Sequence, residues 1–166
     1  MKITAALVLL LGALNVGNLQ ARTLEGKVVG VSDGDTLTLL VDRQPVKIRL
    51  ASIDAPETGK GQKNPGMPYG EASRQALAKQ VFQKTARAEC PSSDHYERHV
   101  CEIFVEGKNI NLEQVRQGMA WAYKQYAKDP AYFEAQKLAQ AQRLGLWKDA
   151  NPKAPWEWRK EKKQSR

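Results

Sequence analysis

The sequence predicts an α+β domain in which five short strands form a small barrel and three α-helices pack against it. Three observations support this fold class. Short runs rich in valine, leucine and threonine are bounded by turn residues, as strands are. Longer segments carry apolar residues at helical spacing. Hydrophobic residues make up 42% of the 166-residue chain, which suffices for one core.

The first three predicted strands lie close together in the chain. Residues 24–31 and 36–41 are rich in Val, Leu and Thr, and Asp33-Gly34 between them is a typical hairpin turn. Gln44-Pro45 turns the chain into a third strand over residues 46–50, where apolar and basic residues alternate. Arg49 therefore points away from the apolar face of that strand.

A loop, a helix and two further strands follow. Residues 58–68 form a loop rich in Gly, Pro, Lys and Asn. Residues 70–84 are predicted to be a helix because Ala72, Ala76, Leu77 and Val81 recur at helical spacing. The last two strands are expected near residues 86–90 and 100–105, with a polar loop between them.

Two more helices complete the predicted domain. Asn111 is a suitable N-cap for a short helix over residues 112–116. Asp129-Pro130 begins a longer helix that continues to about Leu144. Residues 160–166 are charged and are predicted to be disordered. By analogy we expect the oligonucleotide-binding (OB) fold, because it is the commonest barrel of this kind in basic proteins.

The first 21 residues are predicted to be a secretory signal peptide. Lys2 precedes an apolar run that is too short to span a bilayer, and small or polar residues follow. We place cleavage after Ala21, with Gly17 as the second choice, and an uncleaved N-terminal anchor is the alternative. The chain then divides into the signal peptide (1–21), the folded domain (22–150) and a basic C-terminal tail (151–166). A secreted or periplasmic monomer, with no membrane contact after cleavage, is expected.

Export changes the interpretation of the two cysteines. Cys90 and Cys101 would lie in an oxidising compartment, where an even number of cysteines favours a disulfide. Free thiols are one alternative. A zinc site that also uses His95 and His99 is another, although the spacing matches no standard zinc finger.

The charge of the chain favours an anionic partner. Lys and Arg total 26 against 18 acidic residues, a formal net charge of +8. Nucleic acid or an anionic membrane surface would suit such a balance. A basic surface without any such partner fits the composition equally well.

Five charged residues together suggest phosphodiester chemistry. Taken singly, each has an ordinary explanation as a turn or surface residue. As a set, two carboxylates at strand ends offer hard oxygen ligands for Ca²⁺, and a third could take a proton from water. Two arginines can grip a phosphate. These residues are Asp35, Arg49, Asp54, Glu57 and Arg98.

The spacing of these residues resembles the staphylococcal nuclease (thermonuclease) family. The stretch Asp33-Gly34-Asp35-Thr36-Leu37-x-Leu39, followed after nine residues by Arg49-Leu50-x-x-Ile53-Asp54-x-Pro56-Glu57, looks like its first signature. Residues 94–98 resemble its second signature. Residues 111–118 and Ala120-Trp121-Ala122-Tyr123 are also similar, so the resemblance covers about residues 26–148.

The resemblance implies an OB barrel and a calcium-dependent endonuclease that cuts DNA and RNA with little sequence specificity and leaves 3′-phosphate ends. Asp35 and Asp54 match the calcium ligands, and Ala55 matches a residue that contributes its backbone carbonyl. Glu57 matches the proposed general base. Arg49 and Arg98 match the phosphate-binding arginines, and Tyr96 and Tyr123 match positions lining the nucleotide pocket.

Some residues depart from the pattern of that family. His95 stands where lysine or arginine is usual, and we expect it to contact nucleic acid. Glu97 stands where glycine is usual and either pairs with Arg98, weakening its hold on phosphate, or faces water. The same resemblance places Cys90 and Cys101 on neighbouring strands that flank the Arg98 loop. We hypothesise that a disulfide there steadies this loop.

Two other functions remain open at this point. One is a catalytically inactive OB barrel that only binds nucleic acid, although such a module needs no carboxylate cluster. The other is a zinc-stabilised exported adaptor. Among the tryptophans, Trp121 and Trp147 are expected in the core rather than stacked on bases. The stretch 155–160, "PWEWRK", either packs on the barrel or extends the binding surface.

Overall fold

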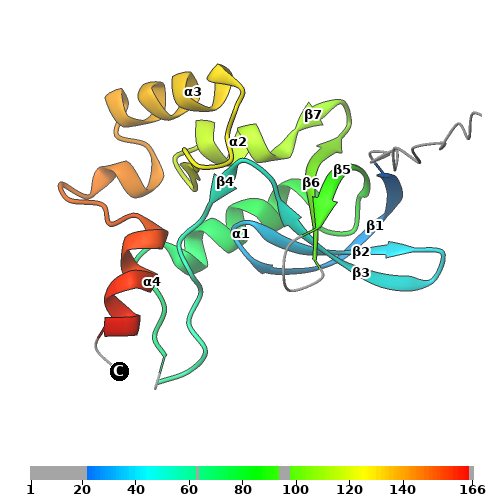
Figure 1. Ribbon diagram of the computed structural model, residues 1–166, viewed down its shortest axis with the longest axis horizontal. Coiled ribbons are helices and arrows are strands. Elements are labelled where there is room, and N and C mark those ends of the chain that lie inside the picture. Colours follow the sequence, from blue (N-terminus) through cyan, green and yellow to red (C-terminus); the bar gives the residue numbers. More distant parts are fainter. Residues whose placement is uncertain (1–21, 63, 94–97, 165–166) are drawn as a thin grey trace, which may run out of the picture.

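The computed structural model describes residues 22–62, 64–93 and 98–164 (Figure 1). The predicted signal peptide lies outside these residues. So do His95, Tyr96 and Glu97, and their predicted roles remain predictions.

Five strands form the predicted barrel. In sheet order they are β3 (Gln44–Leu50), β2 (Thr36–Val41), β1 (Arg22–Asp33), β5 (Thr85–Ser93) and β6 (His99–Val105). Neighbours in this order pair antiparallel, and a parallel pairing of β3 with β6 closes the ring, with Arg49 opposite Val100 and Leu50 opposite Cys101. The short β7 (Lys108–Asn109) extends β6. The predicted α+β barrel is therefore confirmed.

The barrel interior is apolar because alternate strand residues point inward. Val28, Leu37, Leu39, Ile48 and Ile103 are completely buried there. A separate two-stranded pairing joins β4 (Ile53–Asp54) to β8 (Trp121–Ala122). This pairing attaches the chain that follows β3 to the helical part of the molecule.

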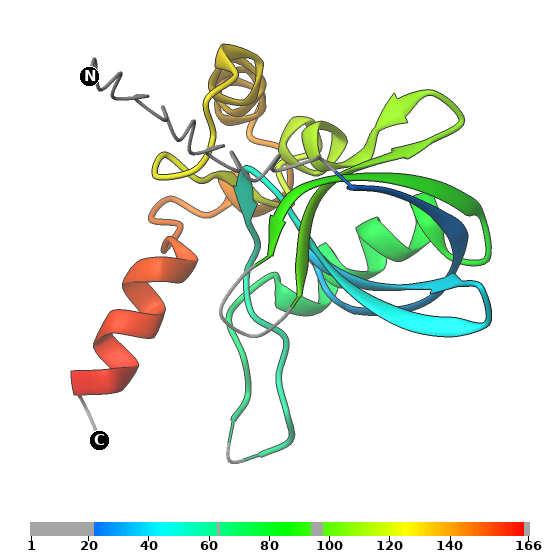
Figure 2. The same ribbon diagram turned by 45° about the vertical axis from the view of Figure 1, so that its right-hand side comes forward.

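The described residues form four α-helices, one more than predicted. They are α1 (Gly70–Val81), α2 (Ile110–Arg116), α3 (Pro130–Ala141) and α4 (Pro155–Gln164), with a short 3₁₀ helix, η1 (Gly145–Lys148), before α4. In Figure 2, α1 lies against the barrel strands, whereas α4 stands away from the barrel beside the long loop of residues 55–69.

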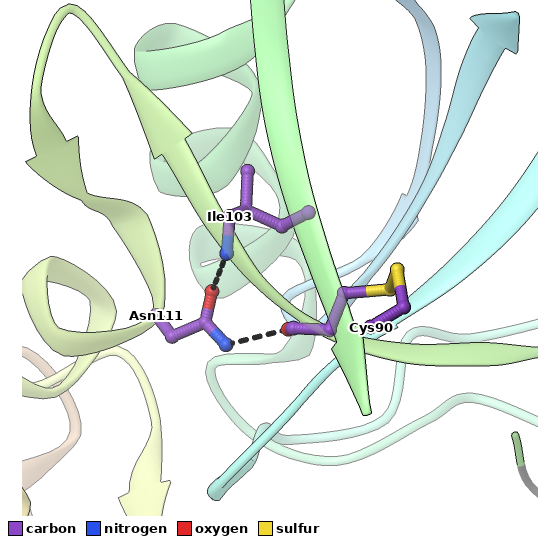
Figure 3. The surroundings of a disulfide bond; sticks show 4 residues. Cys90, Ile103 and Asn111 are labelled. Atoms are coloured by element: carbon purple, nitrogen blue, oxygen red, sulfur yellow. Dashed lines mark hydrogen bonds between the residues drawn. A yellow bond between two sulfur atoms is a disulfide. The ribbon is translucent and has the colours of Figure 1, made fainter. Parts of the chain in front are cut away.

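The predicted N-cap of α2 was wrong by two residues. Asn109 is the cap, and its side chain accepts a hydrogen bond of 3.0 Å from the Leu112 N–H. Asn111 is instead buried inside the first turn. Its Oδ1 accepts from the Ile103 N–H at 3.0 Å, and its Nδ2 donates to the Cys101 carbonyl (Figure 3). The same Nδ2 also donates to the Ala51 carbonyl at 3.0 Å. Both residues are asparagines, so only the packing of α2 on β6 distinguishes their roles.

The other helix predictions were closer to the structure. Asp129 caps α3 as predicted, accepting from the Ala131 N–H at 2.9 Å. The helix ends at Ala141 rather than near Leu144, because Arg143 adopts a positive φ of 52°. At the C-terminus, the prediction of disorder was wrong for residues 160–164, which belong to α4. No helix in the described part of the chain is long and apolar enough to cross a membrane.

A disulfide joins Cys90 on β5 to Cys101 on β6 (Figure 3). Their Cα atoms lie 4.1 Å apart, and both residues are buried. The pairing confirms the predicted disulfide and contradicts the free-thiol alternative and the zinc site that would use these cysteines, since a disulfide leaves no thiolate to bind zinc. The bond lies between the two strands that lead into and out of the segment containing Arg98.

Candidate active site

The turn between β1 and β2 presents Asp35, and two helices hold that turn in place. A Cβ atom on Gly34 would lie 1.8 Å from Ser73 Oγ on α1, so only glycine fits this close approach. Gln114 on α2 is completely buried and donates from Nε2 to the Gly34 carbonyl at 2.8 Å. The glycine is thus required by the packing of α1 against the turn.

The Asp35 carboxylate is buried and fully engaged. Oδ2 accepts from the Ala55 N–H at 2.8 Å, and Oδ1 accepts from the Thr36 hydroxyl at 3.1 Å and pairs with Arg49. Burial alone would raise the pKa of Asp35. The charge of Arg49 and the hydrogen bonds outweigh that effect and lower the pKa below its usual value, so the carboxylate is ionised.

Asp33 plays the turn role that the sequence predicts. Its Oδ1 accepts from the Asp35 N–H at 3.1 Å. The pKa of Asp33 is raised to about 7, mainly by burial and secondly by repulsion from the charge of Asp35. Of the two neighbouring acids, Asp35 is therefore the one that carries a full negative charge at neutral pH.

Arg49 lies between the two buried acids. Besides pairing with Asp35, it donates from Nη2 to Asp54 Oδ1 at 3.0 Å. Burial would lower the pKa of Arg49, but the charges of Asp35 and Asp54 raise it above its usual value. Asp54 has no exposed surface, and burial together with the charge of Asp35 raises its pKa although two arginines act against this.

A third arginine, which the sequence interpretation missed, reaches Asp54 and Glu57 from α4. Arg159 contacts both oxygens of Asp54, with Nη2 2.5 Å from Oδ2 and Nη1 3.2 Å from Oδ1. Its Nη1 also donates to Glu57 Oε1 at 2.8 Å. The available signal was the basic and aromatic stretch 155–160, but no pattern within it indicates that Arg159 meets acids about 100 residues earlier in the chain.

A cleft of about 1140 Å³ brings most of the predicted site residues together. Arg49, Glu57, Arg98 and Tyr123 line it, and Arg159 lines it from α4. Asp35 and Asp54 are buried and do not line the cleft, but both contact Arg49, which does. Of the five charged residues of the predicted set, Arg49, Glu57 and Arg98 line the cleft, and the two buried acids are connected to it through Arg49.

The acidic residues of the cleft suit a hard divalent ion. Within the described ranges, no group of three or more His, Cys, Asp or Glu side chains is arranged to hold a metal. The candidate donors are the buried carboxylates of Asp35 and Asp54, whose negative charges now meet the guanidinium groups of Arg49 and Arg159. Oxygen donors of this kind fit Ca²⁺, with the remaining ligands supplied by backbone, water or substrate.

The fold and the site define a class of protein: an OB barrel with buried acids and arginines at the rim of a basic cleft, which suits phosphodiester chemistry. The model of the family described as "Staphylococcal nuclease homologue" matches residues 47–149. The chain therefore belongs to the staphylococcal nuclease family, as the sequence motifs predict.

Several relatives are similar to this chain over most of its length. A Haemophilus influenzae protein named "Uncharacterized endonuclease" is 46% identical over 138 residues, which is 82% of this chain and 74% of that protein. A Shigella flexneri "Micrococcal nuclease" is 39% identical over 149 residues, covering 83% of this chain and 82% of the relative. "Protein ParB" of Escherichia coli is 39% identical, with coverage of 83% and 80%.

Proposed function

We propose that the protein is an exported, calcium-dependent endonuclease that hydrolyses phosphodiester bonds of DNA and RNA with little sequence specificity and leaves 3′-phosphate ends. The observation that carries this proposal is the chain of contacts from Asp35 through Arg49 to Asp54, with Glu57 and Arg98 in the same basic cleft. Membership of a nuclease family supports it.

The side chains divide the chemical work between them. Asp35 and Asp54, with the Ala55 carbonyl, would hold a calcium ion, whose charge polarises the scissile phosphate when it is bound. Glu57 accepts a proton from water. As the water oxygen bonds to phosphorus, the bond to the 5′ oxygen breaks, and the 5′ oxygen takes up a proton from solvent to leave a 5′-hydroxyl. Arg49 and Arg98 bind the phosphate oxygens and stabilise the negative charge that develops during attack.

The exposure of Glu57 suits its role as the base. Its side chain is 42% exposed in the cleft, so water can reach it, and Arg159 holds one of its oxygens. The same cleft offers charges and aromatic rings rather than a set of groups matched to particular bases. Phosphate contacts carry no sequence information, which supports weak sequence preference.

The central test is cleavage of single-stranded DNA and RNA with millimolar Ca²⁺ and, separately, with chelator. We expect cutting with Ca²⁺ and none in chelator. Glu57→Gln should reduce the rate about 10²–10⁴-fold because the base is lost. Arg98→Gln should reduce it about 10²–10³-fold. Both variants should keep the circular dichroism spectrum of the parent.

The matched control is Lys108→Gln, an exposed residue on β7 outside the cleft, which should cut at the parental rate. Binding of DNA without cutting, under every condition, would favour the inactive nucleic-acid-binding module. Normal cutting by both site variants would contradict the assigned roles of Glu57 and Arg98. End-group analysis of the products tests the expected 3′-phosphate.

A further inference from the structure

Helix α4 forms one wall of the candidate active-site cleft. It spans Pro155–Gln164, beyond the end of the family match at residue 149. Trp156, Arg159, Lys160 and Lys163 of α4 line the cleft together with residues of the barrel. The family match therefore does not account for this wall.

The charges on α4 are segregated by face. The four residues that line the cleft follow the spacing i, i+3, i+4, i+7, which places them on one side of a helix. The acidic residues Glu157 and Glu161 lie outside the cleft lining, and Glu161 pairs with Lys153 at 2.7 Å. A cationic and aromatic face is thus turned toward the cleft.

Three side chains of α4 attach the helix to its surroundings. The Trp156 ring stacks on Tyr123, with centroids 5.2 Å apart and planes 4° apart. Arg159 pairs with Asp54 and Glu57. Lys162 donates to Asn64 Oδ1 at 2.5 Å, which connects α4 to the loop of residues 55–69 beside it in Figure 2. These contacts fix the position of α4 opposite the barrel rim.

The basic side chains of the cleft come from both walls. Lys47 lies on β3, Arg98 directly precedes β6, Lys60 lies on the loop that follows β4, and Lys160 and Lys163 lie on α4. Across the described residues, Lys160 and Lys163 take part in none of the ion pairs of the structure. Their charges are therefore available to an anionic ligand that enters between the two walls.

We propose that a single strand of nucleic acid runs between α4 and the barrel, with Lys160 and Lys163 paired to its phosphates and its bases against the Trp156–Tyr123 pair. Lysines neutralise phosphates, and aromatic rings stack on bases that are free of a duplex. This inference rests on the proposed function, because it assigns the substrate of that function to an additional surface.

The test measures binding without cleavage. A fluorescein-labelled ten-nucleotide oligothymidylate is titrated with the full chain in EDTA, and anisotropy is followed at several salt concentrations. Lys160→Gln/Lys163→Gln should weaken binding about tenfold at low salt. It should also reduce the slope of log K against log salt by about 1.4, since single strands give about 0.7 per phosphate contact.

The matched control is Lys108→Gln/Lys137→Gln, which removes the same charge from exposed positions on β7 and α3 outside the cleft. This control should keep the parental salt slope. If the α4 variant and the control bind alike, the inference is overturned. It is also overturned if the α4 variant binds normally and cuts faster in Ca²⁺, because α4 would then obstruct the site.

The two proposals fail in different ways. If Lys160→Gln/Lys163→Gln reduces the salt slope but the parental protein never cuts with Ca²⁺, the proposed strand-binding role of α4 is supported and the nuclease proposal is contradicted. If the parental protein cuts with Ca²⁺ but the variant keeps the parental salt slope, only the proposed strand-binding role of α4 is contradicted. Trp156→Ala adds an independent readout: it should weaken oligothymidylate binding without changing the salt slope.

Discussion

The buried amide of Gln114 illustrates how single side chains far apart in the chain build this site. Its Nε2 donates to the Gly34 carbonyl at 2.8 Å and to the Ser73 carbonyl at 3.3 Å, and its Oε1 accepts from Gln80 at 3.0 Å. One residue of α2 thereby joins the Asp35 turn to α1. Sequence analysis singled out Asp35 itself but could not find its support, because buried glutamines have no sequence pattern of their own.

Replacing Gln114 with leucine should destabilise the fold by about 2 kcal/mol, because the Gly34 and Ser73 carbonyls would lose a buried donor. Urea denaturation measures this change. Gln140→Leu, at an exposed position of α3, is the control and should change stability by less than about 0.5 kcal/mol. Equal stability of the two variants would show that the amide does not support the turn.

Arg159 gives a second prediction at the scale of one residue. Its guanidinium contacts both oxygens of Asp54, one of the candidate calcium ligands, so the guanidinium and a divalent ion compete for the same carboxylate. Arg159→Gln should therefore bind Ca²⁺ at least about threefold more tightly in the absence of nucleic acid, because like charges repel at this range. Isothermal titration calorimetry measures the affinity.

The control for this prediction is Arg116→Gln, which removes an equal charge from an exposed ion pair with Glu113 on α2. It should leave calcium affinity unchanged. An affinity of Arg159→Gln equal to that of the control would mean that Arg159 moves aside without cost and does not compete with the ion.

At the scale of elements, the strands were easier to predict than the ends of the helices. Strand patterns in this chain are local: Val46, Ile48 and Leu50 alternate with basic residues whatever surrounds them. Helix α4 has no comparable pattern, since it is strongly charged and its contacts are with Tyr123, Asp54 and Asn64. Its order comes from tertiary contacts, which composition does not reveal.

The β5–β6 pair carries a prediction about the disulfide. Cys90 and Cys101 are 11 residues apart, so the chain-entropy model assigns their bond roughly 3 kcal/mol of stability. Reduction should lower the melting temperature and also slow cleavage, because Arg98 lies between the two cysteines. Calorimetry and a cleavage assay with and without reductant measure both effects.

A Cys90→Ala/Cys101→Ala variant separates the bond from other effects of the reductant. Its stability and cleavage rate should not respond to reductant at all. If reduction of the parent leaves both quantities unchanged, the hypothesis that the disulfide steadies the Arg98 segment is wrong.

At the scale of the whole molecule, barrel closure is what assembles the site. Parallel pairing of β3 with β6 brings Arg49 opposite Val100, two residues from Arg98, and thus joins two distant parts of the chain. The two signatures carried these residues, so most of the site was predictable from the sequence. Arg159 was not predictable, because the contact between α4 and the rim of the barrel depends on the tertiary structure.

The position of the disulfide also has a consequence for when the proposed activity would arise. Thiols stay reduced in the cytosol, so a newly synthesised chain there would carry two separate thiols beside the Arg98 segment. The cross-link would form only once the chain met an oxidising environment. Under the proposed function, maturation of a nuclease with little sequence specificity would then coincide with its export from the compartment that holds the genome.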